Sequence, residues 1–192
     1  MKLGVLVSGR GSNLEAVLTA VADGRLAGIE PVVVISNRPD VRALEVAARH
    51  GLPALVLPRA GFGTAAARDR AIGEALAEAS VQLALLAGYD QLLRPSYFEA
   101  FRGRTINIHP SLLPAHGGKG MVGEAVHRSV LAAGEVRTGV TIHEVTRQLD
   151  AGPPLLQVEV PVLAGDDERR LAERVLAVEH RCLVEVLRKL GG

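Results

Sequence analysis

The feature that most constrains the fold is an alternation of short, β-rich apolar runs with longer amphipathic stretches. The first run, residues 3–8, is almost continuously apolar, as expected of a parallel strand covered on both faces. Residues 9–12 break that run, and residues 13–22 then place leucine and valine on one side of a helix. This order is typical of βαβ units, so we predict an α/β fold with a mostly parallel, twisted sheet, helices on both faces and a Rossmann-like N-terminal half.

The same alternation continues to the end of the chain. We predict further strands at residues 31–36, 54–57, 81–87, 105–109, 138–145 and 154–160. We predict further helices at residues 41–50, 65–79, 95–101, 124–133 and 168–190, the last capped by Asp166 or Asp167. Residues 114–123 are rich in glycine and have little apolar pattern, which favours a mobile loop.

Length and composition restrict the class of protein. The 192 residues contain no repeat, low-complexity tract or evident linker, so we expect one domain over residues 1–192. Hydrophobic residues make up 48% and charged residues 22%, which excludes a disordered chain, and a net charge of +1 argues against a nucleic-acid partner. The first apolar run is too short for a signal peptide or a membrane span, so we expect a cytoplasmic protein with no membrane partner.

Metal and disulfide chemistry are not expected. Cys182 is the only cysteine, which excludes a disulfide framework and a cysteine-based zinc site, and we place its side chain in the core. The six histidines form no His-x-His or His-x3-His pair, which argues against a metal site.

Four of the five aromatic side chains fall between residues 89 and 101. One interpretation is a local core patch under a short helix. The other is a pocket wall for a flat ligand.

The first motif that could carry chemistry is Ser-Gly-Arg-Gly-Ser-Asn at residues 8–13, between a strand and a helix. Backbone N–H groups at a helix start, freed by glycines, suit a phosphate. Leu14 replaces the third glycine of a dinucleotide fingerprint, and the Gly-Lys-Ser/Thr of a Walker A loop is absent. The motif therefore indicates either a monophosphate cradle or a tight turn without a ligand.

The second motif is Thr-Ile-Asn-Ile-His-Pro at residues 105–110. Because strand side chains alternate, Asn107 and His109 share one face while the two isoleucines anchor the other. An amide beside an imidazole suits stabilisation of an oxyanion combined with proton transfer. The alternative is a polar strand end that faces solvent.

The third motif is Gln-Leu-Asp-Ala-Gly-Pro at residues 148–153, in a turn after a strand. A loop at this position could bring the carboxylate of Asp150 beside His109, where it would orient the ring and stabilise the imidazolium. The alternative is a turn in which the carboxylate bonds its own backbone.

With residues 107–114, Asn-Ile-His-Pro-Ser-Leu-Leu-Pro, the three motifs make the sequence resemble the phosphoribosylglycinamide formyltransferases, folate-dependent enzymes of purine synthesis. The resemblance extends from Lys2 to about Leu187. It implies the formyltransferase fold, with residues 1–103 as a phosphate-binding half and residues 104–192 as a catalytic and folate-binding half. It also implies transfer of a formyl group from 10-formyltetrahydrofolate to the amine of 5-phosphoribosylglycinamide, giving formylglycinamide ribonucleotide and tetrahydrofolate.

The resemblance also implies residue roles. The catalytic trio corresponds to Asn107, His109 and Asp150, the phosphate site to Gly11, Ser12 and Asn13, and the ribose contact to Glu179. The folate pocket corresponds to Tyr89, Asp90, Gln91, Leu92, Leu93, Asn107 and Thr146. The expected co-substrate is 10-formyltetrahydrofolate with no metal, and the expected partners are small molecules bound by a monomer or homodimer.

The sequence departs from the family pattern at two places. Many members carry Met-Arg where Asp90 and Gln91 stand, and an arginine where Ala65 stands, near the glutamate tail of the folate. The absence of these arginines implies either a weaker affinity for the tail or a different arginine that holds it, and Arg94 and Arg68 are nearest in sequence. Residues 115–126 also form a longer loop than the short version in the family.

Three other functions compete with this interpretation. A formyltetrahydrofolate hydrolase normally has an added N-terminal domain, and a methionyl-tRNA formyltransferase a C-terminal tRNA-binding domain; we expect neither here. A non-catalytic sensor of phosphorylated ligands should have lost a member of the trio, and all three residues are present.

Overall fold

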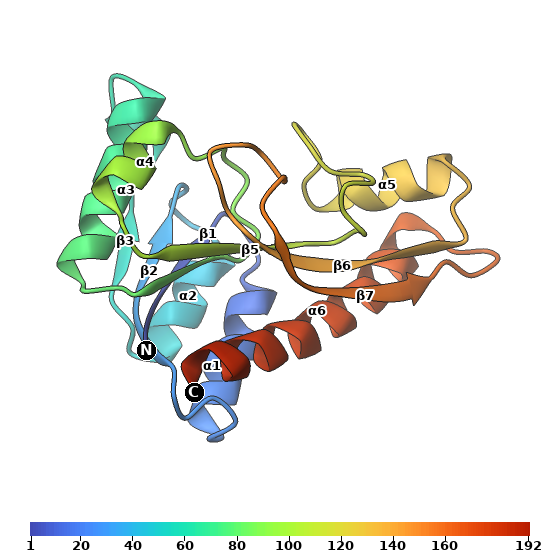
Figure 1. Cartoon of the computed structure of the whole chain (residues 1–192), viewed down its shortest axis with the longest axis horizontal. Coiled ribbons are helices and arrows are strands. Elements are labelled where there is room, and N and C mark those ends of the chain that lie inside the picture. The colour runs from blue at the N-terminus through green and yellow to red at the C-terminus, as the bar shows by residue number, and fades with distance from the viewer.

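The computed structural model describes residues 1–192 and contains a single seven-stranded sheet with helices packed around it (Figure 1). The strands are β1 (Lys2–Val7), β2 (Glu30–Ser36), β3 (Ala54–Val56), β4 (Leu83–Leu86), β5 (Arg104–His109), β6 (Arg137–Glu144) and β7 (Pro154–Pro161). The helices are α1 (Ser12–Ala22), α2 (Arg42–Arg49), α3 (Ala65–Glu78), α4 (Pro95–Ala100), α5 (Glu124–Ala132) and α6 (Glu168–Gly191), with a short 3-10 helix η1 (Arg59–Gly61).

The strands lie in the order β3-β2-β1-β4-β5-β6-β7. The first five in this order run parallel, whereas β6 pairs antiparallel with β5, and β7 antiparallel with β6. The predicted α/β class and mostly parallel sheet are therefore confirmed, as are all the predicted helices and strands, with ends that shift by one or two residues. The 3-10 helix η1 was not predicted.

Two hydrophobic clusters cover the two faces of the sheet. Side chains Leu3, Val5 and Val7 of β1 join the larger cluster, which also contains the apolar faces of α1, α2 and α6. Leu6 points the other way, into a smaller cluster with α3 and α4. Because β1 is buried on both faces, its sequence is continuously apolar rather than alternating.

Helix α6 runs along one face of the sheet from α5 to α1. It packs against α1, α5, β6 and β7, as Figure 1 shows. Asp167 caps its start by accepting a hydrogen bond from the backbone N–H of Arg170, and Cys182 is buried on its inner stripe, as predicted. This path places the middle of α6 beside the first turn of α1.

The carboxyl ends of β1, β4 and β5 lie side by side at one edge of the sheet. The loops that follow these three strands therefore meet there, which is where ligands of open α/β sheets bind. No helix has the length and apolar character needed to cross a bilayer.

Candidate active site

One cavity of about 1440 Å³ lies at this edge of the sheet. All the site residues predicted from the sequence line it, namely Gly11, Ser12, Asn13, Tyr89, Asp90, Gln91, Leu92, Leu93, Asn107, His109, Thr146, Asp150 and Glu179. These residues come from the start of α1, strand β5, the loops after β4 and β6, and the inner face of α6, so the fold brings together groups that are far apart in the sequence.

The start of α1 forms one end of the cavity. Gly11 precedes the helix in the left-handed conformation, with φ 75°, and a Cβ placed there would lie 2.7 Å from the Cα of Ala43. Only glycine fits both the dihedral angle and the close approach of α2. No side chain caps α1, so the N–H groups of its first turn, including those of Ser12 and Asn13, lack partners within the helix. Such a turn can bind an anion.

Asn13 and Glu179 form a buried polar pair beside this turn. The Asn13 amide donates to Glu179 Oε2 over 3.3 Å, while Asn13 Oδ1 is buried without a partner. Burial raises the pKa of Glu179 to about 7, although the hydrogen bond from Asn13 and the nearby Arg10 guanidinium lower it. The other carboxyl oxygen of Glu179, Oε1, has no hydrogen bond within the chain and lines the cavity next to the anion-binding turn, where it suits a ligand hydroxyl group.

Asn107 on β5 lies directly opposite His143 on β6. The distance between Asn107 Nδ2 and His143 Nε2 is 3.1 Å, and His143 Nδ1 lies 2.9 Å from the carbonyl oxygen of Glu144. Because a carbonyl only accepts, His143 carries its hydrogen on Nδ1, and its Nε2 accepts from the amide. One amide hydrogen of Asn107 is thereby fixed, and the other stays available to a ligand in the cavity.

His109, at the end of β5, is 4% exposed and its ring is held by a backbone group. Its Nε2 lies 3.0 Å from the carbonyl oxygen of His116, whereas its Nδ1 has no hydrogen bond within the chain and is not sealed from the cavity. Burial lowers the pKa of His109, and the His116 carbonyl and Asp150 act in the opposite direction. His109 is therefore neutral at pH 7, with its hydrogen on Nε2.

The carboxylate of Asp150 lies near both histidines. Its Oδ2 accepts a hydrogen bond of 2.8 Å from the backbone N–H of Gly118, and its Oδ1 is 3.8 Å from His143 Nε2. Asp150 thus enters the same cavity as His109, as expected, but the contact that orients the His109 ring comes from the His116 carbonyl instead. The reason is that the loop after β5 folds back between the strand end and Asp150.

The segment after β4 forms the opposite wall. Asp90 accepts from Asn37 Nδ2 over 2.8 Å and from Gln91 Nε2 over 3.0 Å, and forms an ion pair with Arg38. Burial raises the pKa of Asp90, but these partners and Ser8 hold it below its usual value. The carboxylate thus remains charged and ties the ends of β2 and β4 together.

The arginines near this wall differ in accessibility. Arg68 is buried, with Nη2 2.6 Å from Asp69 Oδ1, and its Nη1 donates to Gln91. It is therefore already neutralised inside the protein. Arg94 is exposed, lines the cavity and forms no ion pair. Ala65 is buried at the start of α3 and does not line the cavity. Of the two arginines named from the sequence, only Arg94 can reach a ligand.

The aromatic patch serves mainly the core. Tyr97 and Phe101 are buried in the smaller cluster, with their ring centroids 5.8 Å apart. Tyr89 also packs there, yet it lines the cavity, and its hydroxyl is buried without a partner. The core interpretation is therefore confirmed for Tyr97 and Phe101, and Tyr89 also lines the cavity, so that a pocket wall for a flat ligand stays a prediction.

His143 and His116 are the site residues that the sequence interpretation missed. His143 lies on the predicted strand at residues 138–145, and only the pairing of β5 with β6 places it opposite Asn107. His116 lies in a segment without periodicity, and no sequence signal indicates its contact with His109. The side chains contain no group of three or more His, Cys, Asp or Glu residues placed to hold a metal ion.

Comparison with known proteins gives a consistent result. A family model described as formyl transferase matches residues 1–187. The phosphoribosylglycinamide formyltransferase of Escherichia coli (strain K12) is 37% identical over 180 residues, covering 94% of this chain and 82% of the relative. The crystal structure of glycinamide ribonucleotide transformylase 1 from Symbiobacterium toebii superposes with a TM-score of 0.92 at 43% identity, covering 100% of this chain and 87% of that one.

Some relatives are considerably longer. The chloroplastic phosphoribosylglycinamide formyltransferase of Arabidopsis thaliana is 40% identical over 187 residues, which cover 97% of this chain but 64% of the relative. The chain therefore spans less than two thirds of the length of this plant protein.

Proposed function

Since the chain belongs to the formyl transferase family, we propose that it transfers the formyl group of 10-formyltetrahydrofolate to the amine of 5-phosphoribosylglycinamide in purine synthesis. One observation carries this proposal: the amide of Asn107 and the imidazole of His109 project from one strand into a cavity that has an anion-binding turn at one end. That arrangement holds a phosphorylated amine and a formyl donor on either side of two groups suited to acyl transfer.

The reaction follows from the hydrogen-bonding groups around the cavity. The substrate amine attacks the formyl carbon, a carbon–nitrogen bond forms, and the carbonyl oxygen becomes an oxyanion. The free amide hydrogen of Asn107 donates to this oxygen, and its direction is fixed by His143. The bond to the folate nitrogen then breaks, releasing tetrahydrofolate and formylglycinamide ribonucleotide.

One proton must move from the attacking amine to the departing folate nitrogen. His109 is neutral before the reaction, and its Nδ1 is free to accept this proton. The resulting imidazolium lies beside the charge of Asp150, which raises the pKa of His109 and stabilises the cation. The imidazolium also faces the oxyanion until the proton passes to the folate nitrogen.

We assign the rest of the cavity by the same logic. Gly11, Ser12 and Asn13 bind the substrate phosphate through the uncapped turn of α1, and Glu179 contacts the ribose. The wall formed by residues 89–93, with Thr146 and Asn107, takes the folate. The phosphate site thus lies in residues 1–103 and the catalytic residues lie in residues 104–192, whereas the ribose and folate sites draw on both halves.

A spectrophotometric assay with a formylated folate analogue and glycinamide ribonucleotide tests the proposal. We expect folate product only when both reactants are present. His109→Ala should lower turnover by about 100-fold or more while glycinamide ribonucleotide still binds, and Asp150→Asn should lower turnover and alter its pH profile. His50→Gln, at an exposed position after α2, is the control.

Three outcomes would contradict the proposal. Release of folate product without the amine would indicate a hydrolase. Ligand binding without any turnover would indicate a sensor. An unaltered pH profile in Asp150→Asn would separate Asp150 from His109.

A further inference from the structure

The loop between β5 and α5 contains a short strap, residues 115–118, that joins the two catalytic side chains through its backbone. The carbonyl oxygen of His116 accepts from His109 Nε2 over 3.0 Å, and the N–H of Gly118 donates to Asp150 Oδ2 over 2.8 Å. At its start, the carbonyl oxygen of Ala115 accepts from the hydroxyl of Ser111 over 2.6 Å. The strap therefore touches both His109 and Asp150 without using a side chain.

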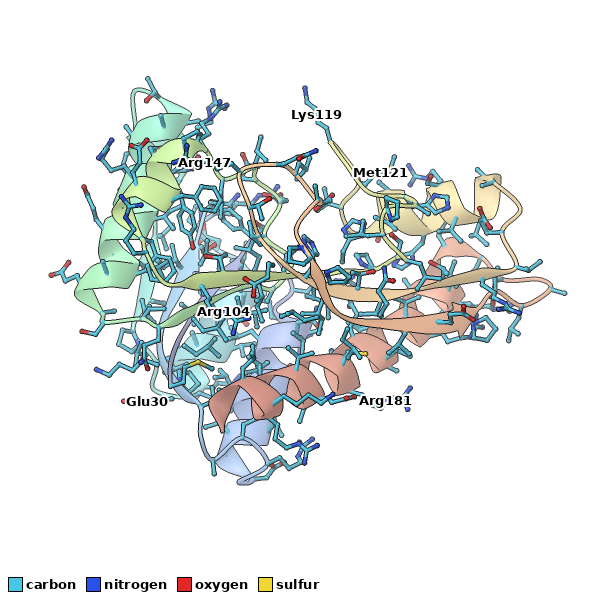
Figure 2. All side chains as sticks on the ribbon, in the orientation of Figure 1. Glu30, Arg104, Lys119, Met121, Arg147 and Arg181 are labelled. Carbon is cyan, nitrogen blue, oxygen red and sulfur yellow. The ribbon has the colours of Figure 1, made fainter.

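The side chain of His116 points the other way and fastens the strap to α5. Its Nδ1 lies 2.8 Å from Ser129 Oγ, and its Nε2 lies 3.8 Å from Glu135 Oε1. The side chain is 14% exposed, so this contact is largely shielded from water. Beyond the strap, the loop extends outward, and Figure 2 shows Lys119 projecting away from the body of the molecule.

The backbone of the strap is closely packed against its neighbours. His116 has φ 54°, in the left-handed region that a non-glycine residue adopts only when its surroundings hold it there. A Cβ on Gly117 would lie 2.5 Å from Leu113 Cδ2 and 3.6 Å from Asp150 Oδ2, so the strap passes tightly between these groups. Its position is set by its contacts and not by its own conformational preference.

We propose that His116 is a positioning residue: by holding the strap on Ser129, it aims its carbonyl at His109 and fixes the reactive form of that ring. A neutral imidazole carries one hydrogen, and a carbonyl can only accept. The contact therefore keeps the hydrogen on Nε2 and the lone pair on Nδ1, facing the cavity. This inference rests on the proposed function, because only an acyl transfer that uses His109 as a base needs that tautomer.

Several charged or titratable groups surround His109, and the strap acts together with them. Burial lowers the pKa of His109 most. The charge of Asp150, in the loop after β6, raises it, while the charges of the His143 and His116 side chains lower it. His127 on α5 belongs to the same group: burial is the main cause that lowers the pKa of His127, and the charges of Arg10 and His109 lower it further. The His116 carbonyl favours the protonated ring, so losing this contact moves the titration of His109 to lower pH.

Three variants test the proposal. His116→Gly keeps the left-handed backbone accessible but removes the anchor, and Ser129→Ala removes the partner of the anchor. His116→Asn is the conservative variant, because asparagine tolerates this conformation and its amide reaches the position of Nδ1. We expect His116→Gly to lower kcat by about 10- to 100-fold, while both KM values stay within about twofold of wild type. Ser129→Ala should also lower kcat. His116→Asn should keep most of the wild-type kcat. The acidic limb of the kcat profile should move to lower pH in the first two variants.

Nitrogen-15 NMR of the histidine rings gives a readout that does not depend on activity. We expect the wild-type signal of His109 to show hydrogen on Nε2, and His116→Gly to show a mixture of both tautomers, with His50 unchanged as the internal control. If the wild type transfers no formyl group, the proposed function fails, and the NMR result still decides the role of the strap. The inference would be overturned if His116→Gly kept the wild-type kcat, pH profile and ring signals. It would also be overturned if His116→Gly lowered the stability and kcat and raised both KM values together, because that result indicates a purely structural role.

Discussion

Asn107 and His143 face each other across β5 and β6, with the amide nitrogen 3.1 Å from a ring nitrogen that can only accept. The imidazole therefore serves as an orienting group for the amide. One amide hydrogen is committed to His143, so the direction of the other is set by the register of two antiparallel strands. Direct pairing of adjacent strands is more rigid than a loop, which suits a donor that must meet a developing oxyanion.

Replacing His143 with phenylalanine should release the Asn107 amide while filling a similar volume. We expect kcat to fall by about 10- to 100-fold, less than for removal of an oxyanion donor itself, with little change in either KM. Combining His143→Phe with Asn107→Ala should give a non-additive loss, because both changes remove the same donor. Thr138→Val, at another buried position on β6 with an unpartnered hydroxyl, is the matched control. Additive losses would contradict the pairing.

Gly11 should be far less replaceable than Gly24, although both have positive φ values, 75° and 82°. A Cβ on Gly24 meets nothing within 4 Å, so Gly24→Ala should cost only the left-handed conformation, about 1 kcal/mol. A Cβ on Gly11 would press against Ala43 and shift the first turn of α1. We therefore expect Gly11→Ala to lower the melting temperature further and to raise the KM for glycinamide ribonucleotide but not for folate. Equal effects of the two variants would argue against the anion-binding turn.

Much of the fold could be predicted because the burial of each helix or strand determines where its apolar residues fall in the sequence. The continuous apolar run of β1 reflects its two buried faces, and the stripe containing Cys182 reflects one buried face of α6. The direction of β6 carries no comparable signal, because the alternation of a strand is the same in parallel and antiparallel pairs. The sequence therefore predicts the element but not its pairing, and the place of His143 opposite Asn107 depends on that pairing.

The candidate site likewise contains some contacts that the sequence predicts and others that it does not. Groups on regular elements, such as Asn107 and His109 on one strand, can be placed together from spacing alone. Contacts made by loops cannot, because they depend on backbone conformations such as the left-handed His116 and on the carbonyl directions that follow. This is why the partner of the His109 ring is a backbone group that no pattern indicates, in place of the expected carboxylate.

Glu179 should weaken the folded protein at high pH. Its pKa is 4.5 ordinarily and about 7 when buried here, so the folded state binds the proton more tightly than the unfolded state. Burial of Glu179 therefore costs little below pH 4.5, and the cost grows as the pH rises to 7, reaching on the order of 3 kcal/mol above it.

Glu179→Gln should remove this cost. We expect a higher free energy of unfolding than wild type at pH 8, a difference that shrinks toward pH 4, and weaker binding of glycinamide ribonucleotide. Denaturant unfolding at several pH values measures the first effect. Glu173→Gln, at an exposed position on α6, is the control and should leave the pH dependence unchanged. A constant difference across the pH range would show that the buried Glu179 is not the cause.

Arg94 should contribute to holding the glutamate tail of the folate. Arg68 is neutralised by Asp69 inside the protein, and Arg38 is paired with Asp90, so Arg94 is the arginine of this wall whose guanidinium is exposed and unpaired. An exposed ion pair contributes up to about 1 kcal/mol, so Arg94→Gln should raise the KM for a triglutamated folate by roughly two- to fivefold. The effect should shrink in high salt and with a monoglutamate, because the contact is screened and the tail carries fewer carboxylates. Arg70→Gln, exposed on α3 and paired with Glu99, is the matched control. An equal rise for the two folates would assign Arg94 to the ring system or to the fold instead of the tail.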